Sequence, residues 1–340
     1  TVADPTLASL VAEAIAGNYS LAQEQARLLA AAQAVTIARA DRFPSLDVSL
    51  GASRRGIRGS SGERILIETY DADIGAFWDA DLWGRLSKEQ QAARLSVAAQ
   101  EARVDSARRD LAAQTANGYF RAIAAKQLLE VTRRRLDNVM ESHEIVASGY
   151  RQGLNDALDL YLARNQVERV RASLAQQEQA VAEAVADLQL ALARYPDGRM
   201  ELASSLPVLP GSIPVGLPSE LLTRRTDLQE AWLNLLAADA RLAAAHKARF
   251  PSLALVGSAG VTSADLSDLL DVDLSVWSAS ASLTQPLFNA GELAAREEQA
   301  RARVQLAEEQ YLDRVFRAFA DVENAISRST SCLLYTSPSP

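Results

Sequence analysis

The chain has 340 residues, a net charge of -8 and 48% hydrophobic residues. This length is sufficient for a sizeable core or two domains, and the negative charge argues against a nucleic-acid partner. The single cysteine, Cys332, excludes a disulfide framework, and His143 and His246 lie far apart in the sequence.

The first 195 residues are predicted to form a helical region, two strands and two long helices. The helical region ends before Phe43-Pro44, because the residue before a proline disfavours the α conformation. Strands are predicted at 44–54 and 66–80, where apolar residues alternate with small or polar ones. Long helices are predicted at 86–148 and 154–195, which are rich in Ala, Leu, Gln, Glu and Arg.

The helix predicted at 86–148 is unusually long. Gly118 is its only helix-breaking residue, and at 1.5 Å per residue the helix would extend about 95 Å. An ordinary helix has about 11 residues. A helix of this length is not needed to form a globular core, so we expect the helical hairpin that turns at 149–154 to span the distance between two separate locations.

The second half of the chain repeats this order of elements. A linker rich in Pro, Gly and Ser is predicted at 196–216, followed by a helix, strands at 251–261 and 274–286, and a helix at 291–328. Residues 329–340 fit nothing before them, so we interpret this tail as foreign sequence and exclude it, with Cys332, from fold reasoning.

A shift of 207 residues superimposes the two halves without gaps. It places Arg42-Phe43-Pro44-Ser45-Leu46 on Arg249-Phe250-Pro251-Ser252-Leu253, and Gly84 on Gly291. The chain therefore contains an internal repeat, with segments 1–195 and 217–328 as its two copies. Only the first copy has a return helix, so we expect the chain to be part of a longer protein.

The four predicted strands have about the length that a tilted strand needs to cross a bilayer. Open strand edges in lipid would leave amides unsatisfied, at several kcal/mol each, and the smallest membrane barrels use about eight strands. If these strands span a membrane, several copies must share one barrel. Aromatic residues near the strand ends would then form a girdle at the membrane interface: Tyr70, Trp78, Trp83, Trp277 and Phe288.

Three carboxylates alternate along the polar face of the strand at 66–80. Asp71, Asp73 and Asp79 are candidates to line a pore and repel anions. The simpler interpretation for each one is that it solvates a polar strand face. His143 and His246 are isolated histidines, and no nucleophile–base pair, phosphate loop or metal-ligand spacing is found, so we predict neither an enzyme nor a cofactor.

Six motifs occur in a characteristic order along the chain: Phe43-Pro44-Ser45-Leu46 with its copy at Phe250, Trp78 to Arg85, Tyr150-Arg151-Gln152-Gly153-Leu154, Ala193-Arg194-Tyr195-Pro196, Leu217 to Leu222, and Pro286 to Gly291. In these motifs the chain resembles the TolC/OprM-like outer membrane factors of tripartite efflux pumps, and most closely the lipoprotein branch that partners RND transporters. The resemblance covers Pro5 to about Arg328.

This resemblance implies a homotrimer with a twelve-strand β-barrel in the outer membrane and a helical tunnel, an α-barrel, through the periplasm. The partners implied are a periplasmic membrane-fusion adaptor and an inner-membrane RND-type pump. The hairpin tip, with Gly149, Tyr150, Gly153 and Leu154, is implied to contact the adaptor. The resemblance also implies a lipidated N-terminal cysteine upstream of Thr1 and a second hairpin tip, with the gate, downstream of Arg328.

Two family motifs depart from the expected pattern. This chain has Asn18-Tyr19-Ser20 and Arg224-Arg225-Thr226-Asp227 where the family often has Asn-Pro and Arg-Arg-Pro-Asp. Each departure removes a proline that suits the first turn of a helix.

The leading hypothesis is a passive outer membrane exit duct for small molecules such as drugs. Export of polypeptides through the same kind of duct, as in type I secretion, is a variant of this hypothesis. The alternative class is a soluble periplasmic coiled-coil adaptor or scaffold, whose alternating segments would belong to a soluble sheet. The strands discriminate between these classes, because a soluble sheet buries one face on its own core.

Overall fold

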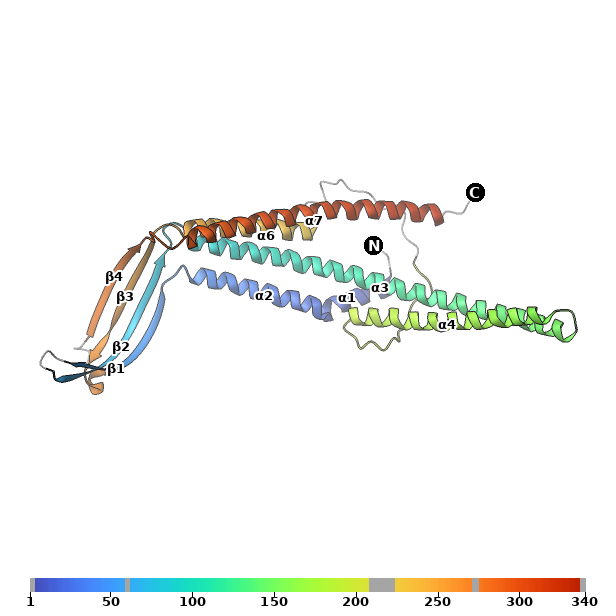
Figure 1. Cartoon of the computed structure of the whole chain (residues 1–340), viewed down its shortest axis with the longest axis horizontal. Coiled ribbons are helices and arrows are strands. Elements are labelled where there is room, and N and C mark those ends of the chain that lie inside the picture. Colours follow the sequence, from blue (N-terminus) through green and yellow to red (C-terminus); the bar gives the residue numbers. More distant parts are fainter. Residues whose placement is uncertain (1–3, 59–61, 208–223, 271–274, 337–340) are drawn as a thin grey trace. The chain divides into compact units, whose positions relative to one another are not determined.

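The computed structural model describes residues 4–58, 62–207, 224–270 and 275–336 (Figure 1). The chain forms two compact units. One contains Thr1–Ala26 and Val104–Gly216, and the other contains Arg27–Arg103 and Leu217–Pro340. Each unit combines two distant segments, so the units do not follow the boundaries of the two predicted repeats.

The first unit is helical. It contains α1 (Pro5–Gly17), the start of α2 (Tyr19–Ala40), most of α3 (Arg85–Arg151) and α4 (Ala157–Ala191). The carboxylate of Asp4 caps α1 by accepting hydrogen bonds from the N–H groups of Thr6 and Leu7. Asn18 caps α2 in the same way, through Ser20 N and Leu21 N. The missing Asn-Pro proline is therefore compensated by a side-chain cap.

α3 and α4 pack against each other around Gly118 in this unit. A Cβ on Gly118 would lie 3.5 Å from Cδ1 of Leu188, an ordinary contact distance, so the packing does not require a glycine at this position. Tyr119, Ile123 and Leu188 are fully buried around it. The prediction of one uninterrupted helix through Gly118 is confirmed, because α3 has 67 residues.

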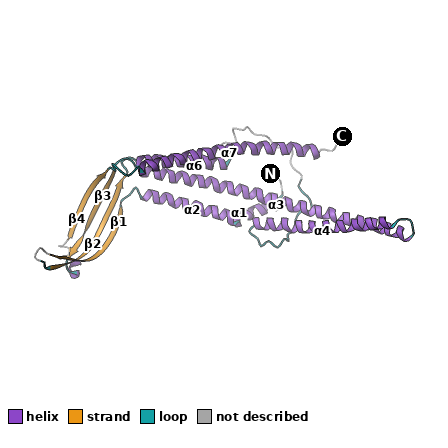
Figure 2. Ribbon diagram, viewed as in Figure 1, coloured by secondary structure: helices purple, strands orange, loops and turns teal. Residues whose placement is uncertain are grey.

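The second unit contains one four-stranded antiparallel sheet in the order β1-β2-β3-β4 (Figure 2). The strands are β1 (Ser45–Arg58), β2 (Arg64–Ala80), β3 (Ser252–Ser263) and β4 (Ser275–Thr284). β1 and β4 are the outer strands, and each pairs with one neighbour only. A short 3₁₀ helix, η1 (Leu266–Leu270), lies between β3 and β4 in the chain.

Two helices, α6 (Thr226–Lys247) and α7 (Glu292–Thr336), pack along each other in the same unit. α6 begins at Thr226 without a proline and without a side-chain cap. The predicted helical residues 219–223 and part of the predicted linker lie outside the described residues. No helix in the described part of the chain has the length and apolarity of a membrane span.

The structure corrects several predicted boundaries. The connection between the strands predicted at 44–54 and 66–80 is shorter than expected, because β1 continues to Arg58 and β2 begins at Arg64. α4 ends at Ala191 instead of 195. α7 continues beyond 328 to Thr336, since the first proline after Arg328 is Pro338.

Candidate functional site

The sheet has one apolar and one polar face. Residues paired directly across antiparallel strands share a face, and the register places Leu50 opposite Ala72, and Ala72 opposite Val261. The other face carries Asp73 between Ser49 and Gly260. Val48 and Leu50 are 75% and 80% exposed, so the apolar face of this edge strand has no covering layer.

Asp71 and Asp73 lie side by side on the polar face. Ser49 Oγ donates a 2.9 Å hydrogen bond to Asp73 Oδ1. A Cβ on Gly51 would overlap the Asp71 carboxylate, and a Cβ on Gly260 would lie 2.6 Å from the Asp73 Cβ. Gly51 therefore leaves the space that the Asp71 carboxylate occupies, and Gly260 allows β3 to approach the backbone of β2 closely at Asp73. Their role in a pore stays a prediction.

Asp79 has a different environment from the other two carboxylates. Its Oδ2 forms an ion pair with Arg85 Nη2 at 2.8 Å, and Arg85 Nη1 forms a second ion pair with Glu89 at 3.0 Å. Sequence patterning placed Asp79 with Asp71 and Asp73, because it could not show that the helix following β2 supplies a cation. The charge of Asp79 is neutralised locally, which weakens its candidacy as a pore-lining anion.

Tyr70 and Trp78 lie on the apolar face of β2, near the two ends of the part that pairs with β3. They are eight residues apart, which corresponds to about 26 Å along a strand. At the tilt of about 35–45° of membrane strands this is a height of about 20 Å, somewhat less than the apolar band of about 25 Å between two aromatic girdles. Trp277 lies at a different position along the strands. It pairs with Ala259, which pairs with Ile74, and Ile74 is midway between Tyr70 and Trp78 on β2. Trp277 is 80% exposed.

Trp83 and Phe288 lie in the turns that lead from strands to helices. The Trp83 indole donates a 2.7 Å hydrogen bond to the Pro251 carbonyl, and its ring lies 5.5 Å from that of Phe250. The Lys247 ammonium donates to the Trp83 carbonyl. Trp83 therefore joins the two strand–helix corners, while Phe288 is almost fully exposed. Their placement at a membrane interface stays a prediction.

The structure reveals a repeated contact that the sequence reasoning missed. In the first repeat, Trp78 Nε1 donates to the Arg42 carbonyl at 3.0 Å, and Arg42 Nη1 donates to Gln90 at 2.7 Å. The shift of 207 residues converts Trp78, Arg42 and Gln90 into Gln285, Arg249 and Glu297.

The same bonds recur in the second repeat. Gln285 Nε2 donates to the Arg249 carbonyl at 3.2 Å, and Arg249 Nη1 donates to Glu297 at 2.7 Å. Hydrogen bonds to Arg249 and His246 lower the pKa of Glu297. In each repeat, these two hydrogen bonds connect the arginine after the shorter helix (α2 or α6) to the end of a strand (β2 or β4) and to the long helix that follows it (α3 or α7). A comparison of polar residues through the repeat would have found this signal.

Asp81 fixes the start of α3. It accepts hydrogen bonds from Leu86 N at 2.9 Å, Ser87 N at 2.8 Å and Ser87 Oγ at 2.6 Å. Partial burial acts to raise the pKa of Asp81, but the bonds from Ser87 and Leu86 and the nearby Arg42 outweigh it, and the pKa is lowered. The long helix therefore leaves the sheet with a defined geometry.

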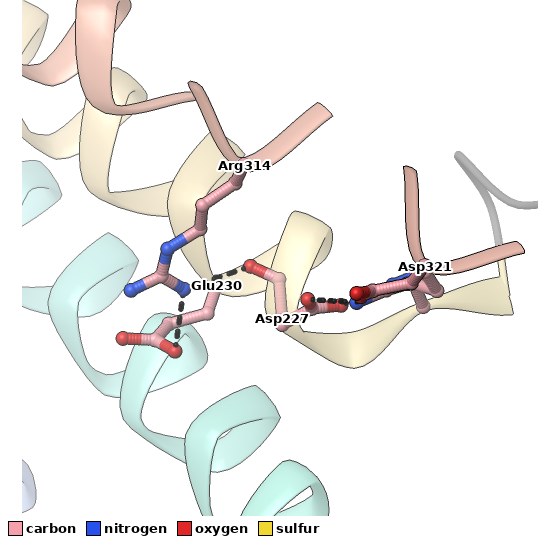
Figure 3. Close-up of polar contacts among 5 residues, drawn as sticks. Asp227, Glu230, Arg314 and Asp321 are labelled. Atoms are coloured by element: carbon pink, nitrogen blue, oxygen red, sulfur yellow. Dashed lines mark hydrogen bonds and ion pairs between the residues drawn. The ribbon is translucent and has the colours of Figure 1, made fainter. Parts of the chain in front are cut away.

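A second missed network joins α6 to α7 (Figure 3). Arg314 of α7 donates to Glu230 Oε2 at 3.1 Å and to the Asp227 carbonyl at 3.0 Å. Arg225 donates two bonds to the Asp227 carboxylate and also reaches Asp321 at 3.1 Å. The Arg225 guanidinium lowers the pKa of Asp227. The Arg-Arg-Thr-Asp motif thus anchors α7, although it lacks the proline.

The hairpin tip between α3 and α4 ends α3 with a Schellman motif. Gly153 N donates to the Tyr150 carbonyl at 3.0 Å, and Leu154 N donates to the Gly149 carbonyl at 2.8 Å. Gly153 adopts φ = +78°, a conformation that favours glycine. Asp156 and Asp159 then form a reciprocal capping box for α4.

The tip presents apolar side chains to solvent. Leu154 is 76% exposed, and Tyr150 is 44% exposed. Gly149 has a packing role, because a Cβ there would lie 2.6 Å from the Asn155 amide nitrogen that reaches back to the Val146 carbonyl. The contact with an adaptor stays a prediction, while the turn itself explains both glycines. The described part of the chain contains no cluster of metal-ligating residues.

Comparisons with known proteins agree with these features. The family "Outer membrane efflux protein" matches residues 10–194 and 217–332. The probable outer membrane lipoprotein SilC of Salmonella typhimurium is 30% identical over 325 residues, which cover 95% of this chain and 70% of SilC. The probable efflux pump outer membrane protein TtgC of Pseudomonas putida is 30% identical over 332 residues, covering 95% of this chain and 68% of TtgC.

A solved structure has the same fold. The crystal structure of a membrane protein from Pseudomonas aeruginosa superimposes with a TM-score of 0.91 at 29% identity, covering 97% of this chain and 78% of that protein. The strand–helix order, the uncovered apolar sheet face and the family match lead to one conclusion: this chain belongs to the outer membrane efflux protein family.

Proposed function

We propose that this chain is the outer membrane duct of a tripartite efflux system, and that three copies share one twelve-stranded barrel. The observation that carries the proposal is the sheet itself. It has four strands, and its outer strands β1 and β4 each leave one edge unpaired. In lipid each unsatisfied backbone group would cost several kcal/mol. Pairing β4 of one copy with β1 of the next removes both edges.

The two faces of the sheet fit such a barrel. The apolar face, bounded by Tyr70 and Trp78, would contact lipid. The polar face, with Asp71 and Asp73, would line a water-filled lumen and favour cations. The exposure of Val48, Leu50 and Trp277 argues against a soluble periplasmic scaffold, since a soluble sheet would bury these side chains on its own core.

The helices would form the periplasmic tunnel of the same assembly. Substrate would pass by diffusion, with no catalytic step, and an inner-membrane RND-type pump would supply the driving force. The exposed tip at Leu154 would dock on the periplasmic adaptor. We further propose that 1–195 and 217–328 are two copies of one repeat, which the two separate family matches support.

Disulfide cross-linking between edge strands tests the shared barrel. Within one sheet β1 and β4 are three strand spacings apart, about 14 Å, beyond the reach of a disulfide. In a Cys332→Ser background, a cysteine at Ala279 of β4 is combined with one at Val48, Leu50 or Ala52 of β1. All four positions lie on the apolar face.

We expect at least one combination to give covalent trimers in the outer membrane fraction, while the single-cysteine variants do not. The cross-linked species resolve by mass on a denaturing gel. Recovery of every variant as a soluble monomer without cross-links would refute the barrel and would favour the periplasmic scaffold.

A further inference from the structure

The β1–β2 ribbon extends beyond the rest of the sheet. β2 pairs with β3 only from Tyr70 to Ala80, whereas β1 and β2 remain paired to Arg58 and Arg64. The other ends of these strands lead to α2 and α3. The extension therefore lies at the end of the strands that faces away from the helices.

This extension carries a charge opposite to that of the chain. Residues 53–69 contain Arg54, Arg55, Arg58 and Arg64 against Glu63 and Glu68, a net charge of +2, whereas the whole chain carries -8. The remaining parts of β1 and β2, residues 45–52 and 70–80, contain only acidic charges. Positive charge thus begins where the pairing with β3 ends.

Arg58 and Arg64 lie directly opposite each other in the ladder. Like charges in this position destabilise a strand pair. Arg54 is neutralised by Glu68 at 3.0 Å, but among the described residues neither Arg58 nor Arg64 has an ion-pair partner. Both side chains are exposed. An anion between them would remove the repulsion.

The two arginines lie on the face that continues the apolar surface. Arg64 is six residues before Tyr70 on the same strand, so their side chains lie on the same face of the sheet. Arg58 lies on this face too, because it pairs directly with Arg64. Six residues correspond to about 20 Å along the strand, less in height for a tilted strand. In the proposed barrel, the arginines lie on the outer side of the Tyr70 girdle, on the face of the sheet that is turned towards the lipid.

We propose that Arg58 and Arg64 form a binding site for a phosphate group of an anionic lipid in the outward-facing leaflet. This inference rests on the proposed function, which sets the orientation of the sheet. A planar guanidinium donates two parallel hydrogen bonds to phosphate oxygens, so two opposed arginines hold one phosphate from two sides. The bound headgroup neutralises the ribbon and anchors the barrel at its outer rim.

Native mass spectrometry of the detergent-solubilised protein tests the site with diphosphorylated lipid A as the probe. We expect Arg58→Gln/Arg64→Gln to weaken lipid A binding at least tenfold, and Arg58→Lys/Arg64→Lys to retain part of it. Arg134→Gln/Arg135→Gln is the matched control, because it removes the same charge from exposed positions of α3. Dephosphorylated lipid A is expected to bind equally weakly to all variants.

Four outcomes would overturn the inference. Unchanged lipid A binding in the Gln variant, or an equal loss in the control, would show that these arginines do not form the site. Displacement of lipid A by millimolar inorganic phosphate would indicate a site for free phosphate. Dissociation of the trimer in the Gln variant would assign the arginines to a contact between copies.

Insertion of the wild-type protein into vesicles separates the two proposals. A protein that inserts as a trimer but fails these binding tests contradicts only the lipid site. A protein that does not insert contradicts the proposed function and the lipid site together.

Discussion

The Glu230–Arg314 contact should hold α6 against α7. The Glu230 side chain is 10% exposed and accepts a 3.1 Å bond from Arg314, which is 39% exposed. Hydrogen bonds to charged groups contribute about 1.5–3 kcal/mol. Glu230→Gln keeps the shape but removes the charge. Because the remaining Arg314 is partly reached by water, we expect a loss of about 2 kcal/mol, near the lower part of that range.

Hydrogen exchange followed by mass spectrometry measures this loss locally, without assuming two-state unfolding of the chain. A loss of 2 kcal/mol corresponds to about 30-fold faster exchange in amides of 226–247 that exchange by local opening. Glu168→Gln is the control, since its pair with Arg171 is exposed on both sides. Such a pair contributes about 0–1 kcal/mol, so exchange near it should change only slightly.

A double-mutant cycle completes the test. Arg314→Gln should cost more than Glu230→Gln, because Arg314 also donates to the Asp227 carbonyl. The double variant should reveal a coupling of about 1–2 kcal/mol. Exchange of α6 within about twofold of wild type in Glu230→Gln would refute the reasoning, because it would mean that water replaces the buried contact without loss.

The remaining predictions concern two caps and the tip. Asp81→Ala should destabilise the start of α3 by about 1 kcal/mol at pH 7. Because the folded-state pKa of Asp81 is lowered from 3.8, this difference in stability should be present above pH 3.8 and should shrink as the pH falls below it. Hydrogen exchange of residues 85–89, followed as a function of pH, measures the difference. An undiminished difference at lower pH would contradict the assignment. Ala193 adopts φ = +56° at the end of α4, so Ala193→Gly should stabilise the chain by about 0.5–1 kcal/mol in thermal unfolding. Gly153→Ala should destabilise the chain by a similar amount. Stability changes of the same sign in both variants would exclude backbone strain as the cause. Leu154→Arg should abolish efflux in cells while the trimer stays intact, whereas Gln152→Arg, with the same added charge, should have less effect; normal efflux with Leu154→Arg would contradict the docking role of the tip.

Periodicity alone determined most of the secondary structure. Alternation of apolar and polar residues marked all four strands, and long stretches with at most one helix-breaking residue marked α3 and α4. Both signals are local, because the position of a residue within its own helix or strand determines which face its side chain occupies. The repeat was equally visible, since a shift of 207 residues preserves the turn motifs that break the periodicity. The open edges of the sheet also followed from a simple count of strands.

The tertiary structure decided how the charged and aromatic residues are used. The extension of β1 and β2 to Arg58 and Arg64 depends on pairing between two segments that lie outside the strands predicted at 44–54 and 66–80. Asp79 is neutralised by Arg85, and Trp277 takes its level from the register of β3 and β4. The bond from Arg314 to Glu230 joins residues that are 84 positions apart. Such contacts arise from packing between distant segments, so a periodic pattern within one element cannot reveal them.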